Sequence, residues 1–373
     1  MTSFSTKLRG ALAKPFLPIV FFFAGVTYDT VTLTRIDRLI DNLILLLYLC
    51  LLGVLIVLKG RADLGKAAVP GSSTAPHVLN RAEPYYPMAI QFLLGGLFSA
   101  YTIFYSQSAS LTTTALFFAL LVILLVGNEF LHNRLSNLTL LISLYALVAF
   151  CFFTFFLPVL TGFMSRIMIV LGAALSLLLA LRIVELVYQG IPGRSRKDAI
   201  KTGWPAVVVV AILVAFYFLN WIPPVPLSLK AGGVYHQVEK IDHAYRVTFE
   251  KGAWYQFLRR SDDLFHGEGP VYCFTAVFAP VDLNTTIYHR WQYRGISSGT
   301  RSTRSAFSTT DRIPIRISGG REGGYRGYTI KQRVPPGEWR IDVETEDGRV
   351  IGRIGFRVAT EAGGALDFHT VTY

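Results

Sequence analysis

The sequence predicts a polytopic α-helical membrane domain followed by an all-β, immunoglobulin-like antiparallel sandwich. Of its 373 residues, 52% are hydrophobic and only 16% are charged, whereas soluble proteins carry about 25% charged residues. Residues 1–227 hold 16 Lys/Arg and 8 Asp/Glu, while residues 228–373 hold 20 and 16. We therefore expect a seven-helix transmembrane domain over 1–222, a Pro-rich linker over 223–231 and a water-soluble β domain over 232–373.

Seven apolar runs approach the roughly 20 residues that cross a bilayer. Polar residues from Tyr28 to Thr30 interrupt the first run, so a cleaved signal peptide is the alternative interpretation there. An uncleaved helix is favoured because no convincing cleavage site follows. The predicted spans are 16–34, 40–58, 86–106, 111–127, 138–160, 166–189 and 204–222.

The short loops predict the orientation, because Lys and Arg concentrate on the cytoplasmic side of membrane proteins. With a cytoplasmic N-terminus, the cytoplasmic segments 1–15, 59–85, 128–137 and 190–203 hold twelve Lys/Arg, against three on the other side. Seven spans then place residues 232–373 outside the cytoplasm. We expect a protein of the bacterial inner (cytoplasmic) membrane with a periplasmic C-terminal domain.

The linker joins an interfacial aromatic residue, Trp221, to the prolines at 223, 224 and 226. Such a segment favours extended polyproline II structure. It is therefore expected to be a short, stiff stalk that holds the β domain close to the membrane.

Residues after 232 change to the period of two that is typical of half-buried strands. Pro314 predicts an edge strand, and Asp347-Gly348 predicts a hairpin turn. About eight strands are expected, near 244–250, 271–279, 287–294, 312–317, 325–332, 339–344, 350–358 and 366–372. Antiparallel strands of this number and length favour an immunoglobulin-like sandwich.

Four short segments carry a family resemblance: VYCF at 271–274, IYHRW at 287–291, GEWRIDV at 337–343 and DGR at 347–349. The C-terminal third resembles the bacterial family catalogued as domain of unknown function 2914, which often follows membrane helices. The resemblance implies a membrane-anchored periplasmic β domain in an envelope protein. It brings no catalytic residues.

Polar residues near the ends of the apolar runs form two candidate intramembrane clusters. Structural clamps at helix ends are favoured over a translocation path, because a carrier places its sites near the midplane; a lipid or headgroup site is the third possibility. Arg182 is expected to pair with Glu129 or Glu185. The outer cluster contains Asp29, Arg35, Asp37, Arg38 and Asp41, and the inner one Asn128, Glu129, Arg182 and Glu185.

The predicted β domain also concentrates positive charge, with ten Lys/Arg and two Asp/Glu over 285–335. One interpretation is a solvated sheet face that pairs with the acidic segment 338–347. The other is an anion-binding surface, since arginine forks suit phosphate and carboxylate groups. The candidate residues for an anion-binding face are Tyr288, Arg290, Arg294, Arg312 and Arg316.

Signals for chemistry are weak. The Gly-rich stretch 319–327 lacks the Gly-Lys-Ser/Thr ending of a phosphate-binding loop. The histidines show no zinc-ligand spacing, and His289 shares the apolar strand face with Trp291, which predicts a core residue. Cys273 is likewise expected in the core. We therefore predict no catalytic residue, no metal and no cofactor, and leave enzyme activity open with a preference against it.

The favoured hypothesis is a non-enzymatic envelope protein whose β domain binds an anionic envelope component or another membrane protein. The expected partners are membrane lipids and, beyond them, anionic headgroups, cell-wall glycan or membrane proteins, but not nucleic acid. One alternative is a lipid- or headgroup-handling transporter or enzyme that uses interfacial polar residues. A second alternative is an accessory subunit of a larger membrane complex.

Overall fold

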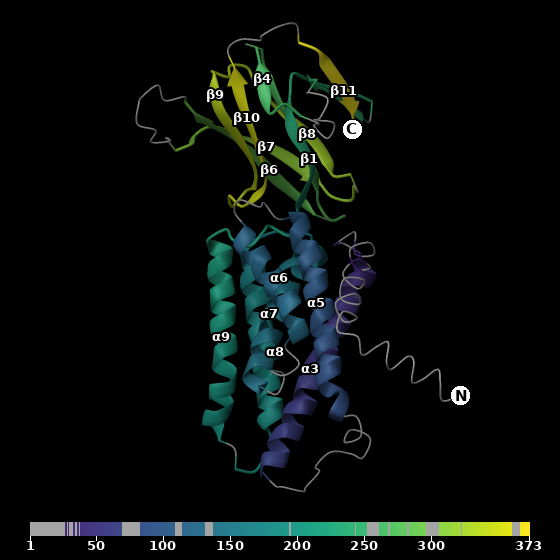
Figure 1. Ribbon diagram of the computed structural model, residues 1–373, viewed down its shortest axis with the longest axis vertical. Helices are drawn as coiled ribbons and strands as arrows, with labels where there is room; N and C mark the ends of the chain where they lie inside the picture. Colours follow the sequence, from purple (N-terminus) through teal and green to yellow (C-terminus); the bar gives the residue numbers. More distant parts are fainter. Residues whose placement is uncertain are drawn as a thin grey trace, which may run out of the picture.

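The computed structural model shows a helical bundle with a β-rich region stacked on one end along the long axis of the molecule (Figure 1). It describes residues 27, 29, 33, 36, 38–68, 83–108, 114–130, 137–193, 195–242, 244–251, 261–267, 269–281, 283–295, 306–321, 323–359 and 366–373.

The described part of the bundle contains six α-helices and one short 3₁₀ helix. The central helix α7 contacts four of the others, α3, α5, α8 and α9. The helices are α3 (Leu39–Ala68), η1 (Glu83–Tyr85), α5 (Tyr86–Ser108), α6 (Ala115–Phe130), α7 (Leu138–Thr161), α8 (Arg166–Tyr188) and α9 (Arg196–Phe218).

Five described helical segments are long and apolar enough to cross a membrane: Leu39–Lys66, Glu83–Ser108, Leu138–Thr161, Arg166–Tyr188 and Arg196–Phe218. A sixth, Ala115–Asn128, is apolar but shorter. Large hydrophobic side chains on α3, α8 and α9 point outward and are exposed, as expected for helices that face lipid. The structure thus supports a membrane protein, and the first predicted span, 16–34, lies almost entirely outside the described residues.

Contacts with the β region fix the direction of the helices. Lys230 Nζ lies 3.3 Å from Gln107 Oε1 at the end of α5, and Met164, between α7 and α8, packs against the core of the β region. At the opposite end of the bundle, Arg61 Nε donates to the carbonyl of Leu186 at 2.8 Å. The Lys/Arg-rich end of α3 (residues 59–68) and the start of α9 (residues 196–203) therefore lie at the end of the bundle farthest from the β region.

Eleven strands make up the described β region. All pairings are antiparallel except that of β4 with β10. The strands are β1 (Ser228–Tyr235), β2 (Gln237–Ile241), β3 (Ala244–Glu250), β4 (Leu264–His266), β5 (Val271–Phe278), β6 (Asn284–Arg294), β7 (Ser308–Ser318), β8 (Tyr325–Lys331), β9 (Gly337–Thr345), β10 (Val350–Ala359) and β11 (Phe368–Thr372).

The strands form three sheets, with orders β1-β5-β8, β4-β10-β9-β6-β7 and β11-β3-β2. The first two pack face to face around a core that includes Cys273, Trp291 and Trp339. The third packs on the other side of β5, where Phe274 belongs to a separate core. Strand β5 therefore lies between two cores, which explains why nearly all of its residues are buried.

Two local predictions are confirmed. Strand β7, which contains Pro314, is an edge strand of the five-stranded sheet, since proline cannot donate a ladder hydrogen bond. The Asp347-Gly348 turn joins β9 to β10, and Gly348 has a φ of 81°, a backbone conformation that favours glycine.

The proline segment differs from the extended stalk that the sequence predicts. Residues 222–228 are all buried, and Ile222 and Val225 belong to the core of the bundle together with Phe278 of β5. Two tight hydrogen bonds, Val225 N to Pro223 O at 2.8 Å and Leu227 N to Pro224 O at 3.0 Å, fold it into turns. Strand β1 also begins at Ser228, so residues 228–231 of the expected linker lie in this strand.

Candidate functional site

The outward side of the five-stranded sheet, called here the outer sheet face, gathers positive charge from four strands. Along β6 and β9 alternate side chains, such as those of Trp291 and Ile341, point into the core. Their neighbours on each strand point outward. The register then aligns Arg312, Arg290, Asp342 and Arg353 in one row across β7, β6, β9 and β10. Seven arginines lie on this side: Arg290, Arg294, Arg312, Arg316, Arg340, Arg353 and Arg357.

Asp342 lies at the centre of this face with its side chain fully buried and three guanidinium groups around it. Its carboxylate lies 2.6 Å from Arg353, 3.1 Å from Arg290 and 3.7 Å from Arg340. Burial alone raises the pKa of Asp342, but the hydrogen bonds and charges of the arginines outweigh burial and hold this pKa below its usual value. The carboxylate is therefore a permanent negative charge that orders the arginines.

Two further carboxylates, Glu344 and Glu338, also pair with arginines of this face. Glu344 lies 3.1 Å from Arg290 and 2.7 Å from Arg312, and Arg294 Nε donates to Glu338 at 2.9 Å. Thus Arg290, Arg294 and Arg312 pair with the acidic segment, which is the first of the two interpretations open from the sequence. Seven arginines against three carboxylates still leave the outer sheet face with an excess of four positive charges.

Aromatic rings accompany the arginines. The guanidinium of Arg312 lies 3.7 Å from the centroid of Tyr288, and those of Arg294 and Arg340 lie 4.3 and 4.4 Å from that of Phe307. Such stacking fixes the guanidinium planes and leaves their edges available for bidentate hydrogen bonds.

Two grooves lie along this sheet. One of about 590 Å³ lies near the end farthest from the bundle and is lined by Phe307, Arg340, Arg353 and Arg357, among others. The other, of about 380 Å³, is lined by Arg316, Asn284 and Thr285. Arg316 is exposed, and its strand end pairs with the start of β6, close to the bundle.

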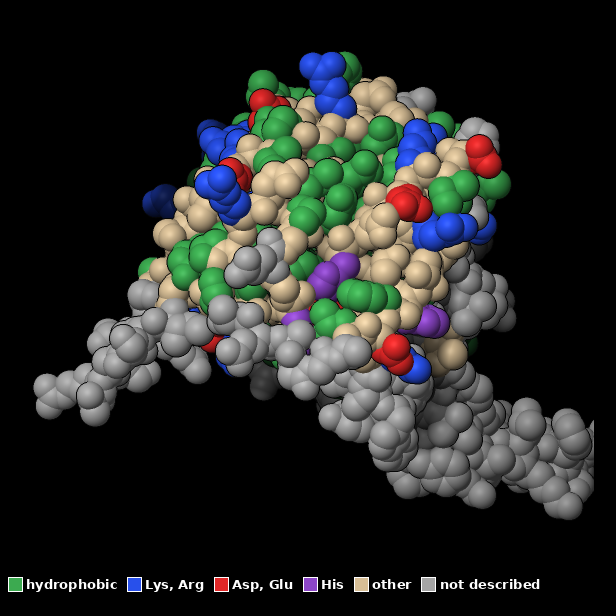
Figure 2. Space-filling view, turned by 90° about the horizontal axis from the view of Figure 1, so that it is seen from above, with side chains coloured by type: hydrophobic (Ala, Val, Ile, Leu, Met, Phe, Trp, Pro, Cys, Tyr) green, Lys and Arg blue, Asp and Glu red, His purple; other side chains and the backbone are tan. Residues whose placement is uncertain are grey.

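A second group of polar residues lies at the opposite end of the β region from the bundle. We call His236, Glu250, Asp262 and His266 the distal cluster. His236 follows β1, Glu250 ends β3, and His266 ends β4. Figure 2 looks down on this end of the molecule and shows histidine side chains reaching the surface.

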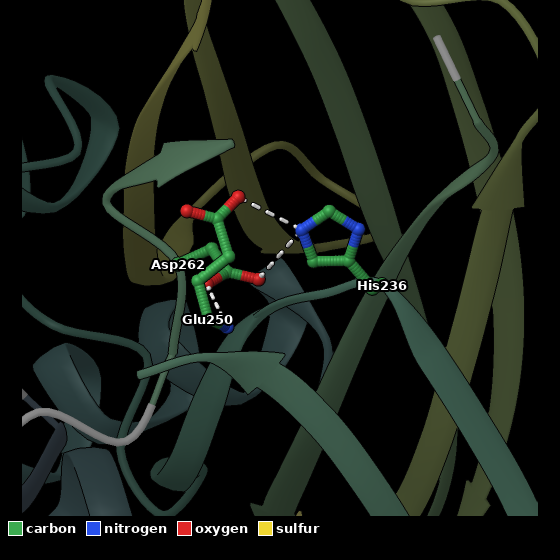
Figure 3. A group of neighbouring side chains, drawn as sticks. All are labelled: His236, Glu250 and Asp262. Atoms are coloured by element: carbon green, nitrogen blue, oxygen red, sulfur yellow. Dashed lines mark hydrogen bonds and ion pairs between the residues drawn. The ribbon is translucent and has the colours of Figure 1, made fainter. Parts of the chain in front are cut away.

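Three members of the distal cluster converge on one point (Figure 3). The ligand atoms of His236, Glu250 and Asp262 lie within 4.8 Å of one another. Both carboxylates are buried, Glu250 at 6% and Asp262 at 1% exposure. Sequence reasoning missed this group because these three residues are separated by more than ten positions, and backbone hydrogen bonds from His236 to Thr248 and from Asp262 to Val234 bring them together.

The pKa shifts of Glu250 and His236 favour an ionised carboxylate beside a neutral imidazole. Burial lowers the pKa of His236, an effect that outweighs its bonds with Glu250. Burial raises the pKa of Glu250, but hydrogen bonds from His266 and His236 outweigh burial and hold this pKa below its usual value. A neutral imidazole with an ionised carboxylate is the state in which both groups bind metal ions.

The predicted intramembrane clusters are only partly described. Asp29 and Asp41 are half-buried and Arg38 is exposed, whereas Arg35, Asp37 and the side chain of Glu129 lie outside the described residues. Asn128 is buried and exchanges hydrogen bonds with Gln91, since each side-chain amide donates to the other's backbone carbonyl at 3.0 Å. Asn128 therefore joins α6 to α5, as a structural clamp does.

Arg182 pairs with Glu185 at 2.6 Å, which is one of its two expected partners. The side chains are 66% and 62% exposed, so this ion pair lies on the outer surface of α8.

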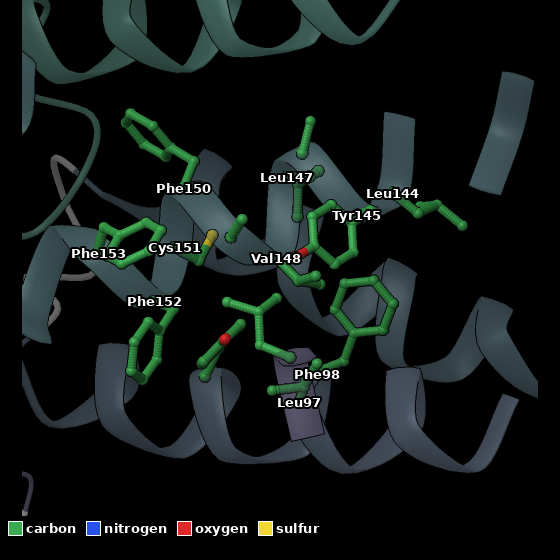
Figure 4. Packing of buried hydrophobic residues seen from close by; sticks show 14 of the residues in the cluster. Leu97, Phe98, Leu144, Tyr145, Leu147, Val148, Phe150, Cys151, Phe152 and Phe153 are labelled. Carbon is green, nitrogen blue, oxygen red and sulfur yellow. The ribbon is translucent and has the colours of Figure 1, made fainter. Parts of the chain in front are cut away.

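The bundle interior described by the structure is packed with aromatic side chains. Figure 4 shows Phe98 of α5 beside Tyr145 and Val148 of α7. Phe104 and Phe155 meet edge to face with 5.5 Å between ring centroids, and the hydroxyl of Tyr105 donates to the carbonyl of Cys151 at 3.0 Å. Tyr105 thus binds a backbone group of a neighbouring helix.

His289 is a core residue, as the sequence predicts. It is fully buried, with Nδ1 2.9 Å from Thr329 Oγ1 and Nε2 2.9 Å from Thr275 Oγ1. Burial lowers its pKa to about 4. Both ring nitrogens have partners, so this histidine is neutral and structural. Cys273 is also buried in this core, as expected.

Comparison with known proteins supports the family resemblance. The model of the family described as protein of unknown function (DUF2914) matches residues 284–358. The DUF2914 match runs from β6 to β10 and includes all seven arginines of the outer sheet face, whereas the distal cluster lies outside it.

No curated protein matches this sequence. Among solved structures, it aligns with the Pseudomonas fluorescens alkylpurine DNA glycosylase AlkC bound to DNA containing an abasic site analog. The alignment has 10% identity and a TM-score of 0.23, and covers 82% of this chain and 98% of that one. Values this low support no inference about fold or function.

Proposed function

We propose that this protein is a non-enzymatic, membrane-anchored envelope protein whose β region binds an anionic envelope component through the outer sheet face. The observation that carries the proposal is the excess of arginine on that face, ordered by buried Asp342. Pre-ordered guanidinium groups lose little conformational freedom on binding an anion. Phosphate and carboxylate groups of lipids or cell-wall polymers have the chemistry that such forks bind.

The membrane part of the proposal has seven spans, with the N-terminus in the cytoplasm and an immunoglobulin-like sandwich in the periplasm of a bacterial inner membrane. Its support is the position of the β region at the Lys/Arg-poor end of the bundle. Packed sheets around Trp291 and Trp339 support the sandwich.

Features of the bundle favour an anchor over a transporter or a lipid-handling enzyme. A carrier uses polar groups near the midplane, often at broken helices. Here aromatic side chains fill the described interior between α5 and α7, and Asn128 binds backbone groups of α5.

The test uses the full-length protein in nanodiscs of neutral lipid, because the buried segment 222–228 joins the β region to the bundle. Binding to phosphatidylglycerol vesicles and to cell-wall fragments is measured at low and high salt. Arg316→Gln with Arg357→Gln removes two exposed arginines of the outer sheet face. At about 1 kcal/mol for each basic residue near an anionic surface, affinity is expected to fall roughly 30-fold.

The matched control is Arg246→Gln, which removes an exposed arginine from β3 in a different sheet. Its binding is expected to equal that of the wild type. Wild-type protein that shows no salt-sensitive binding to either material would refute the proposal, and so would an equal loss in the control.

A second candidate function is that of an accessory subunit in a membrane complex. The observation that favours it is the Arg182–Glu185 pair on the outer surface of α8, surrounded by exposed leucines. Charged groups in membrane helices are costly in lipid and commonly face protein or water. Crosslinking from position 182 in native membranes, followed by mass spectrometry, tests whether another protein covers this surface.

A further inference from the structure

The distal cluster has a geometry close to that of a tetrahedral metal site. His236 Nε2 lies 2.9 Å from Glu250 Oε1 and 3.8 Å from Asp262 Oδ2. Zinc bonds to nitrogen and oxygen of about 2.0–2.2 Å place neighbouring tetrahedral ligands roughly 3.3–3.5 Å apart. These two distances bracket this value, and all three ligand atoms lie within 4.8 Å of one another, so a small rearrangement of the side chains would close the site around an ion.

The prospective ligands are already held in place. The ring of His236 stacks on Phe265, with centroids 4.0 Å apart and an interplanar angle of 13°, which fixes the direction of Nε2. Asp262 Oδ1 accepts from the backbone N–H of Glu250 at 2.8 Å, so its other oxygen is the one directed at His236.

Glu250 is oriented from its far side by His266. Its Oε2 lies 2.7 Å from the Nδ1 of His266, and its Oε1 accepts the backbone N–H of the same residue at 2.7 Å. Metal-binding carboxylates are commonly held by outer hydrogen bonds of this kind, which tune affinity.

We propose that the distal cluster binds one Zn²⁺ ion through His236 Nε2 and one oxygen each of Glu250 and Asp262, with His266 positioning Glu250. One imidazole and two carboxylates suit zinc, whereas Ca²⁺ prefers six to eight oxygen ligands and Mg²⁺ an octahedral shell. Three protein ligands leave the fourth position to water or to an exogenous ligand. The ion would tie together the ends of β1 and β3 and the segment before β4.

The test uses the untagged full-length protein in detergent, stripped with a chelator and titrated with ZnCl₂ by calorimetry. The wild type is expected to take up one ion per chain with micromolar affinity or better and to melt at a higher temperature when loaded. Asp262→Asn keeps the acceptor for the Glu250 N–H and the side-chain volume, and it is expected to abolish uptake. His236→Gln is expected to do the same.

His266→Gln tests the positioning role, because loss of an outer partner weakens metal affinity by about 10–100-fold without abolishing it. The matched control is His369→Ala, which removes an exposed histidine outside the cluster and is expected to bind as the wild type does. Circular dichroism of the metal-free variants checks that each one folds.

The absorption spectrum of the Co²⁺-loaded wild type tests the proposal even if the variants do not fold. Co²⁺ in place of Zn²⁺ is expected to give the intense visible bands of a four-coordinate site. Three results would overturn the proposal: no stoichiometric uptake at millimolar ZnCl₂, uptake unchanged in both Asp262→Asn and His236→Gln, or equal competition by Ca²⁺ or Mg²⁺.

Discussion

The guanidinium of Arg349 lies over the ring of Tyr217, with 4.5 Å between the guanidinium carbon and the ring centroid. Arg349 belongs to the hairpin between β9 and β10, and Tyr217 to the last turn of α9. Arg349 Nε also lies 2.9 Å from Asp347, which in turn lies 4.0 Å from Arg166 at the start of α8. These contacts connect one hairpin of the β region to two helices of the bundle.

Replacing Arg349 by Ala is expected to loosen this junction. A cation–π contact of a desolvated arginine contributes about 2 kcal/mol, and only 4% of Arg349 is exposed. Thermal denaturation of the full chain should show this loss, and proteolysis within 222–228 should become faster. Arg246→Ala, which removes an exposed side chain of β3, is the control; cleavage at the wild-type rate in Arg349→Ala would contradict the prediction.

Asp342→Asn is expected to destabilise the protein by about 3 kcal/mol, the lower end of the range for breaking a buried ion pair. Three partly exposed arginines would lose their common carboxylate, and water would offset part of the cost. Chemical denaturation measures the change. Asp367→Asn removes an exposed partner of Lys251 and should cost about 0–1 kcal/mol; equal effects in the two variants would show that Asp342 does not order the face.

Acid is expected to weaken the fold through His289. Its folded-state pKa is about 4, whereas an unfolded histidine titrates near pH 6.5. The unfolded chain therefore binds the proton first, so this contribution is complete above about pH 6.5 and falls by about 3 kcal/mol as the pH drops toward 4.

Unfolding free energies measured from pH 7 to pH 4 test this prediction by comparing the wild type with His289→Leu. The variant should be less stable at pH 7, since Thr275 and Thr329 lose their partner, but its pH dependence should be shallower. His369→Gln should keep the wild-type slope. Parallel curves for His289→Leu and the wild type would mean that His289 is protonated in the fold.

Arg182→Leu is expected to change stability by less than about 1 kcal/mol, because its exposed ion pair with Glu185 lies within the last two turns of α8, where water and headgroups can solvate Glu185. From the sequence alone, the same substitution would be expected to leave a carboxylate unpaired in a low-dielectric interior. Folded yield and melting temperature in detergent measure the difference. A loss like that of a buried pair would place Arg182 against another helix in the membrane.

Much of the β region was predictable because one face of each strand packs against the core and the other faces water. The alternation around Trp291 predicted the two faces of residues 287–294 in β6, and Pro314 and Asp347-Gly348 marked an edge and a turn. Strand β1 was not predictable: Gly232 and Gly233 give no alternating signal, and prolines precede them.

The candidate sites were less predictable than the strands. Arginines on β6 and β7 were visible in the sequence, but their pairing with Asp342 depends on the order of strands, which alternation does not determine. For the distal cluster, His236, Glu250 and Asp262 meet through strand ends that are distant in sequence. Neither spacing nor composition carries that information.

Burial of residues 222–228 fixes how the β region stands above the lipid. Strand β6 has 11 residues and so extends roughly 35 Å, several times the Debye length of about 8 Å at physiological salt. Arg316, near the base, is then within electrostatic reach of headgroups, whereas Arg294 and Arg357 at the far end are screened from them. A β region held in this way keeps its upper arginines at a constant height above the surrounding bilayer, so the anions that we propose they bind would come from material other than that bilayer.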